Sequence, residues 1–349
     1  MLYIRTDMNT VIATGHVMRC LAIADAAKEQ GENVTFILAD KEAEQFVQGR
    51  GYQTIILHTK WDDMESELPL LREIIHKYSI HKLLIDSYQV TYMYLMELTK
   101  LVWTVYLDDI NAFHYPVNAI ICYANYWKKF CYEKNYKNTE LYLGPRYAPL
   151  RKEFFDIREK NVKNSPENLL LLSGGTDNFH ILEDILSAIT VENWGRIDVI
   201  CGLYFSDYER LQMKYQKEKN IQFHKAVPDV MKYMESADIA ISAGGFTLYE
   251  LCAAGTPTIS YSFADNQLYN VNQFDEDHTI IYAGDIRHKN IVPMICDILT
   301  NCYSKKNVRQ EFSKKMQKLV DGKGSGRIAD ILIRKSETES KNIKMGDEG

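Results

Sequence analysis

The sequence lacks long apolar runs, and its cysteines follow no recognisable pattern. No stretch approaches the ~18 apolar residues of a membrane span, and the first residues lack the basic and then apolar segments of a secretory signal. The seven cysteines are odd in number and include no Cys-x-x-Cys pair, which argues against a disulfide framework or a zinc site. We therefore expect a cytoplasmic protein with reduced thiols and no membrane insertion.

An excess of positive charge is also missing. The formal net charge of -6 argues against a general binder of nucleic acid or anionic membranes. Neither Gly-x-Gly-x-x-Gly after the first predicted strand nor Gly-x-x-x-x-Gly-Lys-Ser/Thr is present, which disfavours standard dinucleotide oxidoreductases and P-loop ATPases. The aspartates at predicted strand ends of the first half come without a metal-binding spacing, so we expect no metal and no cofactor.

What the sequence does contain is a repeated alternation of short apolar runs and longer amphipathic stretches. This pattern predicts parallel strands covered by helices, and 349 residues suggest two domains. We expect an α/β fold of two facing Rossmann-like doubly wound domains with an interdomain cleft. The expected strands are 2–5, 34–38, 54–57, 82–85, 102–107, 169–172, 197–200, 239–241 and 258–261. The expected domains are 1–150 and 151–335, joined by a connection within 126–166, with a helix at 305–319 and a disordered tail at 336–349.

A Gly-His pair follows the first predicted strand, at the start of a helical pattern. The positive end of the helix dipole disfavours imidazolium, so a histidine there tends to stay neutral and able to act as a base or to bind an anion. Gly15 and His16 therefore mark a candidate catalytic position. The alternative is a histidine that only caps the helix.

A second glycine turn lies in the other half of the chain. Gly244 and Gly245 follow a predicted strand and precede a helix that begins near Thr247, an arrangement that lets backbone amides approach a diphosphate. Glu250 lies about one helical turn further on, where its two carboxylate oxygens could bind a ribose diol. The alternative is a tight turn followed by a solvated glutamate.

Polar residues also follow other predicted strands. Asp7, Asp86, Asp108 and Asp109 come at strand ends of the first half, where carboxylates could orient a base or hold a substrate, or could simply cap helices. Residues 173–177 repeat a glycine turn at the start of the second half, as a further phosphate-binding or hinge candidate. Ligands of open α/β sheets bind at this edge of the strands.

Taken together, these motifs resemble those of one family, the nucleotide-sugar hydrolases of pseudaminic acid biosynthesis and the related spore coat polysaccharide biosynthesis proteins. The resemblance runs from Arg5 to about Gln267 and is carried by the order and spacing of Arg5-Thr6-Asp7, Gly15-His16-Val17-Met18-Arg19, Ile85-Asp86-Ser87-Tyr88, Asp108-Asp109, Gly174-Gly175-Thr176-Asp177, Ile241-Ser242-Ala243-Gly244-Gly245 and Thr247-Leu248-Tyr249-Glu250. The chain departs from the family pattern at Ala13, Cys122 and Phe246. Phe246 could crowd the phosphate loop or pack against the base.

The resemblance implies a glycosyltransferase-B-like fold and the hydrolysis of UDP-2,4-diacetamido-2,4,6-trideoxy-β-L-altropyranose to the free sugar and UDP. In that interpretation His16 is the general base that activates water. The substrate-binding residues would be Asp7, Gly15, Arg19, Tyr88, Gly175, Asn266 and Gln267, and the UDP-binding residues would be Gly244, Gly245, Thr247 and Glu250. The expected partner is a UDP-sugar, with no nucleic acid, and the protein is expected to be a monomer or a weak dimer.

Two other functions fit the same residues. A UDP-sugar-dependent glycosyltransferase of surface polysaccharide biosynthesis would share the fold and the UDP site, and it would differ only in its second substrate. A noncatalytic protein that binds a nucleotide sugar would have no need of the base at His16.

Overall fold

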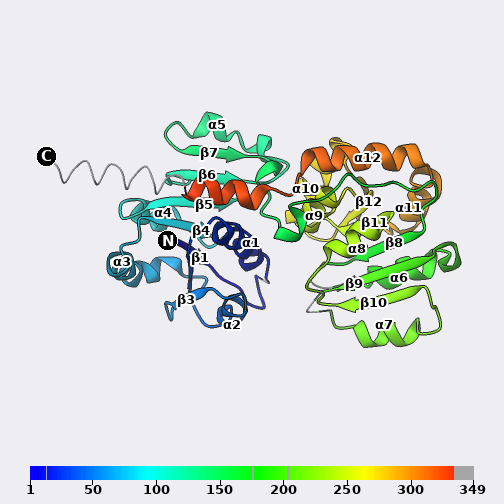
Figure 1. Cartoon of the computed structure of the whole chain (residues 1–349), viewed down its shortest axis with the longest axis horizontal. Coiled ribbons are helices and arrows are strands. Elements are labelled where there is room, and N and C mark those ends of the chain that lie inside the picture. Colours follow the sequence, from blue (N-terminus) through cyan, green and yellow to red (C-terminus); the bar gives the residue numbers. More distant parts are fainter. Residues whose placement is uncertain (13, 175–176, 203–204, 334–349) are drawn as a thin grey trace. The chain divides into compact units, whose positions relative to one another are not determined.

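The computed structural model describes residues 1–12, 14–174, 177–202 and 205–333 (Figure 1). Three features of the sequence lie outside the described residues. They are the tail expected at 336–349, Ala13, which departs from the family pattern, and Gly175, which was predicted to bind substrate. The chain divides into two compact units, which are described separately. The first unit comprises Met1–Lys152 and the segment from Gly322 onward, and the second comprises Glu153–Asp321.

The first unit is built on a parallel sheet. Within the described residues it has seven strands in the order β3-β2-β1-β4-β5-β6-β7. Most of these strands are buried, and parallel strands covered on both faces form near-continuous apolar runs. The strands are β1 Leu2–Thr6, β2 Val34–Leu38, β3 Gln53–Ile56, β4 Lys82–Asp86, β5 Trp103–Asp108, β6 Ala119–Cys122 and β7 Glu140–Leu143.

Helices connect these strands. The longest is α1, which follows β1 and buries an alanine-rich face. The α-helices are α1 Gly15–Glu29, α2 Glu44–Gln48, α3 Leu68–Lys77, α4 Tyr92–Thr99 and α5 Tyr132–Asn135, and the 3-10 helices are η1 Met64–Glu67, η2 Trp127–Phe130, η3 Pro145–Tyr147 and, at the junction with the second unit, η4 Lys152–Phe154.

The second unit repeats this architecture. Its described residues form a six-stranded parallel sheet in the order β10-β9-β8-β11-β12-β13. The strands are β8 Asn168–Leu172, β9 Arg196–Cys201, β10 Ile221–Lys225, β11 Ile239–Ala243, β12 Thr258–Ser262 and β13 Ile281–Asp285. Helix α12, at Lys306–Leu319, confirms the helix predicted at 305–319.

The helices of the second unit cover both faces of its sheet. Helix α6 packs against α11 on one face, whereas α9 packs against α8 and α12 on the other. The bounds are α6 Ile181–Ala188, η5 Val191–Asn193, α7 Tyr208–Lys214, α8 Met231–Ser236, α9 Thr247–Ala254, α10 Asp265–Glu276, α11 Val292–Asp297 and η6 Ile298–Cys302. The expected α/β fold with two Rossmann-like sheets is therefore confirmed.

The segment 126–166 is more than the expected connection. It contains β7, which pairs with β6 and completes one edge of the first sheet. All four residues of β7 are only partly buried, and its sequence Glu-Leu-Tyr-Leu is too short and too polar to resemble the buried strands. An edge strand buries less surface than a central one, so its sequence carries a weaker signal.

The chain returns to the first unit after the second sheet is complete. The described helical residues 324–333, red in Figure 1, lie with the first unit rather than in the predicted domain 151–335. Ser325 Oγ donates a hydrogen bond to the Leu150 carbonyl at 2.6 Å, and Lys82 Nζ donates to the Leu332 carbonyl at 2.5 Å. These contacts place the returning segment beside the point where the chain leaves the first unit.

No helix among the described residues is both long enough and apolar enough to cross a membrane.

Candidate active site

His16 lies at the start of α1, beside the end of β4. Its Nδ1 atom is 2.7 Å from Oδ1 of Asp86, the last residue of β4, and both side chains are buried. β1 and β4 pair in parallel, so the start of α1, which follows β1, lies next to the carboxyl end of β4. A histidine and an aspartate that are 70 residues apart thus form a pair.

Arg19 holds the carboxylate of this pair from the other side. One turn along α1, its Nε and Nη2 atoms donate to the two Asp86 oxygens at 2.6 and 2.5 Å. Burial alone would raise the pKa of Asp86, but Arg19 and His16 hold that pKa well below its usual range. Asp86 is therefore ionised at neutral pH.

The ionised carboxylate determines which nitrogen of His16 carries the proton. An anionic oxygen at 2.7 Å from Nδ1 favours the tautomer in which Nδ1–H donates to Asp86, which leaves a lone pair on Nε2. Arg19 Nη2 also lies 2.9 Å from Nδ1, and it cannot donate there while Nδ1 carries its proton. The arrangement leaves Nε2 able to accept a proton, as a general base must.

Two tyrosines and Asp109 surround the same arginine. The hydroxyls of Tyr88 and Tyr123 donate to Asp109 Oδ2 at 3.0 and 2.5 Å, and Arg19 Nη1 donates to the same oxygen at 3.1 Å. The Tyr88 ring meets the His16 ring edge-on, with centroids 4.6 Å apart. The structure thus brings together the predicted residues His16, Arg19 and Tyr88.

Tyr123 was not predicted, because it lies 104 residues from Arg19 in a segment with no motif. Its hydroxyl lies 2.5 Å from Arg19 Nη1 and shares Asp109 with Tyr88. Burial raises the pKa of both tyrosines, Tyr88 and Tyr123, so their phenols stay neutral and act as donors. Asp109 Oδ1 is buried and has no hydrogen-bond partner among the described residues.

Asp7 belongs to a different cluster. Arg5 Nη1 donates to its Oδ2 at 2.5 Å, and the Ala39 N–H donates to its Oδ1 at 2.8 Å. Arg5 is itself fully buried and makes two hydrogen bonds to Glu67, at 2.8 and 2.7 Å. Both oxygens of Asp7 are therefore engaged by the protein, and its expected contact with a sugar remains a prediction.

Asp108 also has protein partners, in a third cluster. Its carboxylate accepts hydrogen bonds from the backbone of Ile110 and Asn111 and from the hydroxyls of Tyr115 and Tyr132. Of the four aspartates singled out in the sequence, only Asp86 and Asp109 contact the histidine and arginine of α1.

In the second unit, Gly244 is required by close packing. A Cβ atom on Gly244 would lie 2.2 Å from Val271 Cγ1 and 3.3 Å from the Tyr261 carbonyl oxygen. The Gly244 N–H donates to that carbonyl at 2.8 Å. Asn270 of α10, which the sequence did not indicate, donates through Nδ2 to the carbonyls of Gly244 and Gly245 at 3.0 and 3.3 Å.

Gly245 lies in a different environment from Gly244. Apart from its neighbours in the chain, no described residue would have a heavy atom within 4 Å of a Cβ atom built there. Helix α9 begins two residues later at Thr247, and its N-cap residue, Phe246, provides no side-chain cap. The ring of Phe246 stacks on that of Tyr249, with centroids 5.5 Å apart. Asn270 thus holds the carbonyls of this turn, and no side chain caps the start of α9, which is the kind of helix end that can bind an anion.

Of the other residues predicted to bind UDP or substrate in the second unit, Thr247 and Glu250 lie on α9, and Asn266 and Gln267 lie on α10. Glu250 is half-buried on the first turn of α9, and Asn266 is exposed in the first turn of α10. Gln267 Oε1 accepts a hydrogen bond from the Phe263 N–H at 3.0 Å and so stabilises the turn before α10. Asp177 caps α6, because its two oxygens accept the N–H groups of Ile181 and Leu182 at 3.0 and 3.1 Å.

The two glycines are expected to respond differently to substitution. Gly245→Ala should lower the affinity for UDP about tenfold or more without loss of stability, because its Cβ would enter open space where a phosphate would lie. Gly244→Ala should destabilise the second unit by about 1–3 kcal/mol through its clash with Val271. Calorimetric titration with UDP and urea unfolding measure the two effects. Equal UDP affinity in wild type and Gly245→Ala would contradict the assignment of this turn to a phosphate.

Known proteins are similar to this chain in sequence. The glycosyltransferase family 28 C-terminal domain matches residues 169–322, most of the second unit. The spore coat polysaccharide biosynthesis protein SpsG of Bacillus subtilis strain 168 is 26% identical over 331 residues, which cover 91% of this chain and 93% of that protein.

Two glycosyltransferases are also similar. A UDP-N-acetylglucosamine--N-acetylmuramyl-(pentapeptide) pyrophosphoryl-undecaprenol N-acetylglucosamine transferase of Helicobacter pylori strain G27 is 27% identical over 200 residues, 53% of this chain and 55% of that enzyme. This chain therefore matches about half of that transferase. The crystal structure of Acinetobacter baumannii MurG has a TM-score of 0.70 at 12% identity, with 95% of this chain and 99% of that one covered. The fold is thus that of the glycosyltransferase-B class.

These comparisons contradict the expected nucleotide-sugar hydrolase. The matching domain family and the transferase relative are described by sugar transfer, whereas none of the proteins named above is described as a hydrolase. The kinship with spore coat proteins is supported, and the link to pseudaminic acid is not. A base and a diphosphate site serve hydrolysis and transfer equally, so these residues could not identify the acceptor.

Proposed function

We propose that this protein is a glycosyltransferase that takes a sugar from a UDP-sugar donor, in the biosynthesis of a surface or spore coat polysaccharide. The observation that carries the proposal is the buried Asp86–His16 pair, which leaves Nε2 of His16 as a base. The match of the second unit to a glycosyltransferase domain supports sugar transfer as the reaction class.

In the proposed reaction the first unit supplies the base. Nε2 of His16 removes the proton of an acceptor hydroxyl as that oxygen attacks the anomeric carbon of the donor sugar. The bond between the anomeric carbon and the diphosphate oxygen breaks, and UDP leaves with the electron pair. Asp86 stabilises the imidazolium that forms, and Arg19 keeps Asp86 ionised and in place.

The second unit is proposed to hold UDP. Its open turn at Gly245 and the start of α9 would present backbone N–H groups and the positive helix end to the diphosphate. Glu250, one turn along α9, would accept hydrogen bonds from the ribose hydroxyls. The N–H groups and the helix end would stabilise the negative charge that UDP gains as it leaves, which would lower the barrier to transfer, whereas Glu250 would only position the ribose.

The proposal is tested by UDP release from UDP-N-acetylglucosamine with and without added sugar acceptors. Transfer predicts that release rises by at least about tenfold with the right acceptor and that a product containing both sugars forms, because the base acts on the acceptor hydroxyl. Mass spectrometry identifies the product. Full-rate release in water alone, with no acceptor dependence, would contradict transfer.

A further inference from the structure

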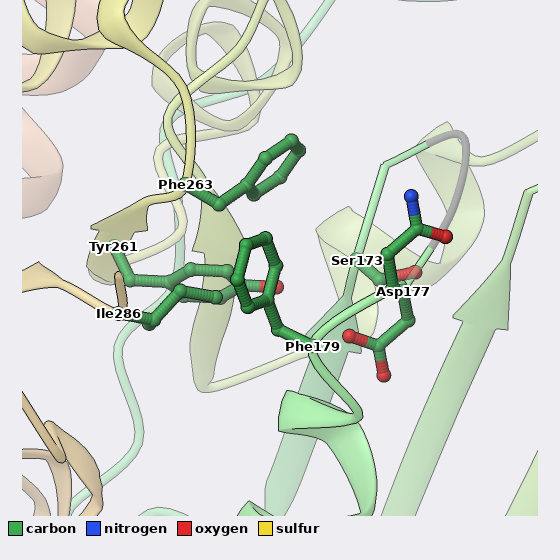
Figure 2. Close-up of a pocket in the computed structure, with 7 residues that line it drawn as sticks. Ser173, Asp177, Phe179, Tyr261, Phe263 and Ile286 are labelled. Carbon is green, nitrogen blue, oxygen red and sulfur yellow. The ribbon is translucent and has the colours of Figure 1, made fainter. Parts of the chain in front are cut away.

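A small pocket at the carboxyl edge of the second sheet has no role in the reaction described so far. About 20 Å³ of it is open to water-sized molecules. Figure 2 shows aromatic rings on one side of the pocket and polar side chains on the other. The pocket is lined by Ser173, Asp177, Asn178, Phe179, Tyr261, Phe263 and Ile286.

The aromatic wall is partly exposed. Phe179 retains 46% exposure although it precedes a buried helix, and its ring lies 6.3 Å from that of Phe263 at an angle of 37°. Tyr261 and Ile286 continue this wall into the apolar core beneath α6 and α11. Such a surface favours an apolar group over a hydroxyl.

One polar atom in the pocket has no partner. Ser173 is 1% exposed, and its Oγ makes no hydrogen bond to any described residue. Asp177, by contrast, has both oxygens occupied by the first N–H groups of α6. A buried hydroxyl without a partner costs free energy unless a ligand or water satisfies it.

The pocket adjoins the turn assigned to the diphosphate. The backbone carbonyl of Tyr261, whose side chain is part of the wall, accepts a hydrogen bond from the Gly244 N–H at 2.8 Å. Leu172, the residue before Ser173, pairs with Ser242 of β11. Glu250 lies on α9, and α9 packs with α8 and α12 on the face opposite α6 and α11. If the nucleoside lies on the α9 side, the sugar at the other end of the diphosphate lies towards this pocket.

We propose that this pocket binds a methyl-bearing substituent of the donor sugar. The inference rests on the proposed function. The open volume fits a single methyl-sized group and not a whole sugar ring. The methyl could come from an acetamido group, whose amide N–H would donate to Ser173 Oγ, or from the C6 carbon of a 6-deoxy sugar. In either case Phe179 and Phe263 select against a fully hydroxylated hexose.

Calorimetric titration of the full chain with four compounds tests this selectivity: UDP, UDP-glucose, UDP-N-acetylglucosamine and UDP-6-deoxyglucose. Wild type should bind at least one methyl-bearing donor about fivefold or more tightly than UDP-glucose, since methyl burial is favourable. Phe179→Ala and Phe263→Ala should abolish this preference without changing the affinity for UDP. Phe179→Leu, which keeps an apolar wall, should retain most of it.

Control variants separate the possible outcomes. Phe46→Ala, which truncates a phenylalanine of the first unit with 39% exposure, should leave the preference intact. Ser173→Ala should weaken only the binding of UDP-N-acetylglucosamine if the acetamido group is the occupant. Absence of UDP binding in wild type would overturn the proposed function itself. UDP binding with no methyl preference, or with a preference that survives in both alanine variants of the pocket, would overturn the pocket assignment alone.

Discussion

His16→Asn is expected to lower the turnover number for sugar transfer by about 10²–10⁴-fold, because no other group then takes the proton of the acceptor. The affinity for UDP should stay the same, since the residues proposed to hold UDP belong to the second unit. Rates of acceptor-dependent UDP release, with calorimetric titration of UDP on the same samples, measure the two quantities separately.

Two further variants make this result specific. Asp86→Asn should lose activity to a similar extent while His16 remains, because an amide that donates to Nδ1 would favour the wrong tautomer. His81→Asn, at an exposed position of the same unit, should keep full activity. If His16→Asn transfers sugar at the wild-type rate, His16 has only a structural role at the start of α1.

Glu67→Ala is expected to destabilise the first unit by about 3–5 kcal/mol. The substitution removes both hydrogen bonds from the fully buried guanidinium of Arg5 and leaves Asp7 as its remaining carboxylate partner, and breaking a buried ion pair by removing one partner is costly. Urea unfolding followed by tryptophan fluorescence measures this effect. Three of the four tryptophans, Trp61, Trp103 and Trp127, belong to the first unit.

The neighbouring Glu65 provides a matched control. Its side chain is exposed and accepts one hydrogen bond, from the Thr91 hydroxyl, so Glu65→Ala should change stability by less than about 0.5 kcal/mol. If both variants unfold at the same urea concentration, the Arg5–Glu67 pair does not stabilise the unit.

Most of the inner strands could be predicted from the sequence because their residues are buried on both faces. The strands β6, β7, β10 and β13 were not predicted individually. β7 and β10 are edge strands with partly exposed or charged residues, such as His224 and Lys225 in β10, so their local sequences resemble loops. β13 is also an edge strand and contains a glycine. β6 is a buried inner strand of four residues, and nothing in the structure explains why it was missed.

Some residues of the candidate site could likewise be predicted from the local sequence, and others could not. Gly15 and His16 stand next to each other at a strand-to-helix turn, so a local pattern was sufficient to select them. Tyr123 and Asn270 act on residues far along the chain, and no local motif indicates such contacts. Glu67 lies in a polar segment of the sequence, and only the fold places Arg5 beside it. The roles of the site residues remain predictions.

The return of the chain to the first unit makes the second unit an insertion. Residues 153–321 form one continuous stretch, whereas the first unit needs two pieces of chain. The two ends of the insertion are joined on the first unit, where Ser325 Oγ bonds the Leu150 carbonyl and a Cβ on Gly324 would lie 2.0 Å from the Ala148 carbonyl oxygen. A short linker from residue 152 to residue 322 could therefore replace the whole second unit, whereas a chain that stopped after residue 321 would lack a piece of the first unit.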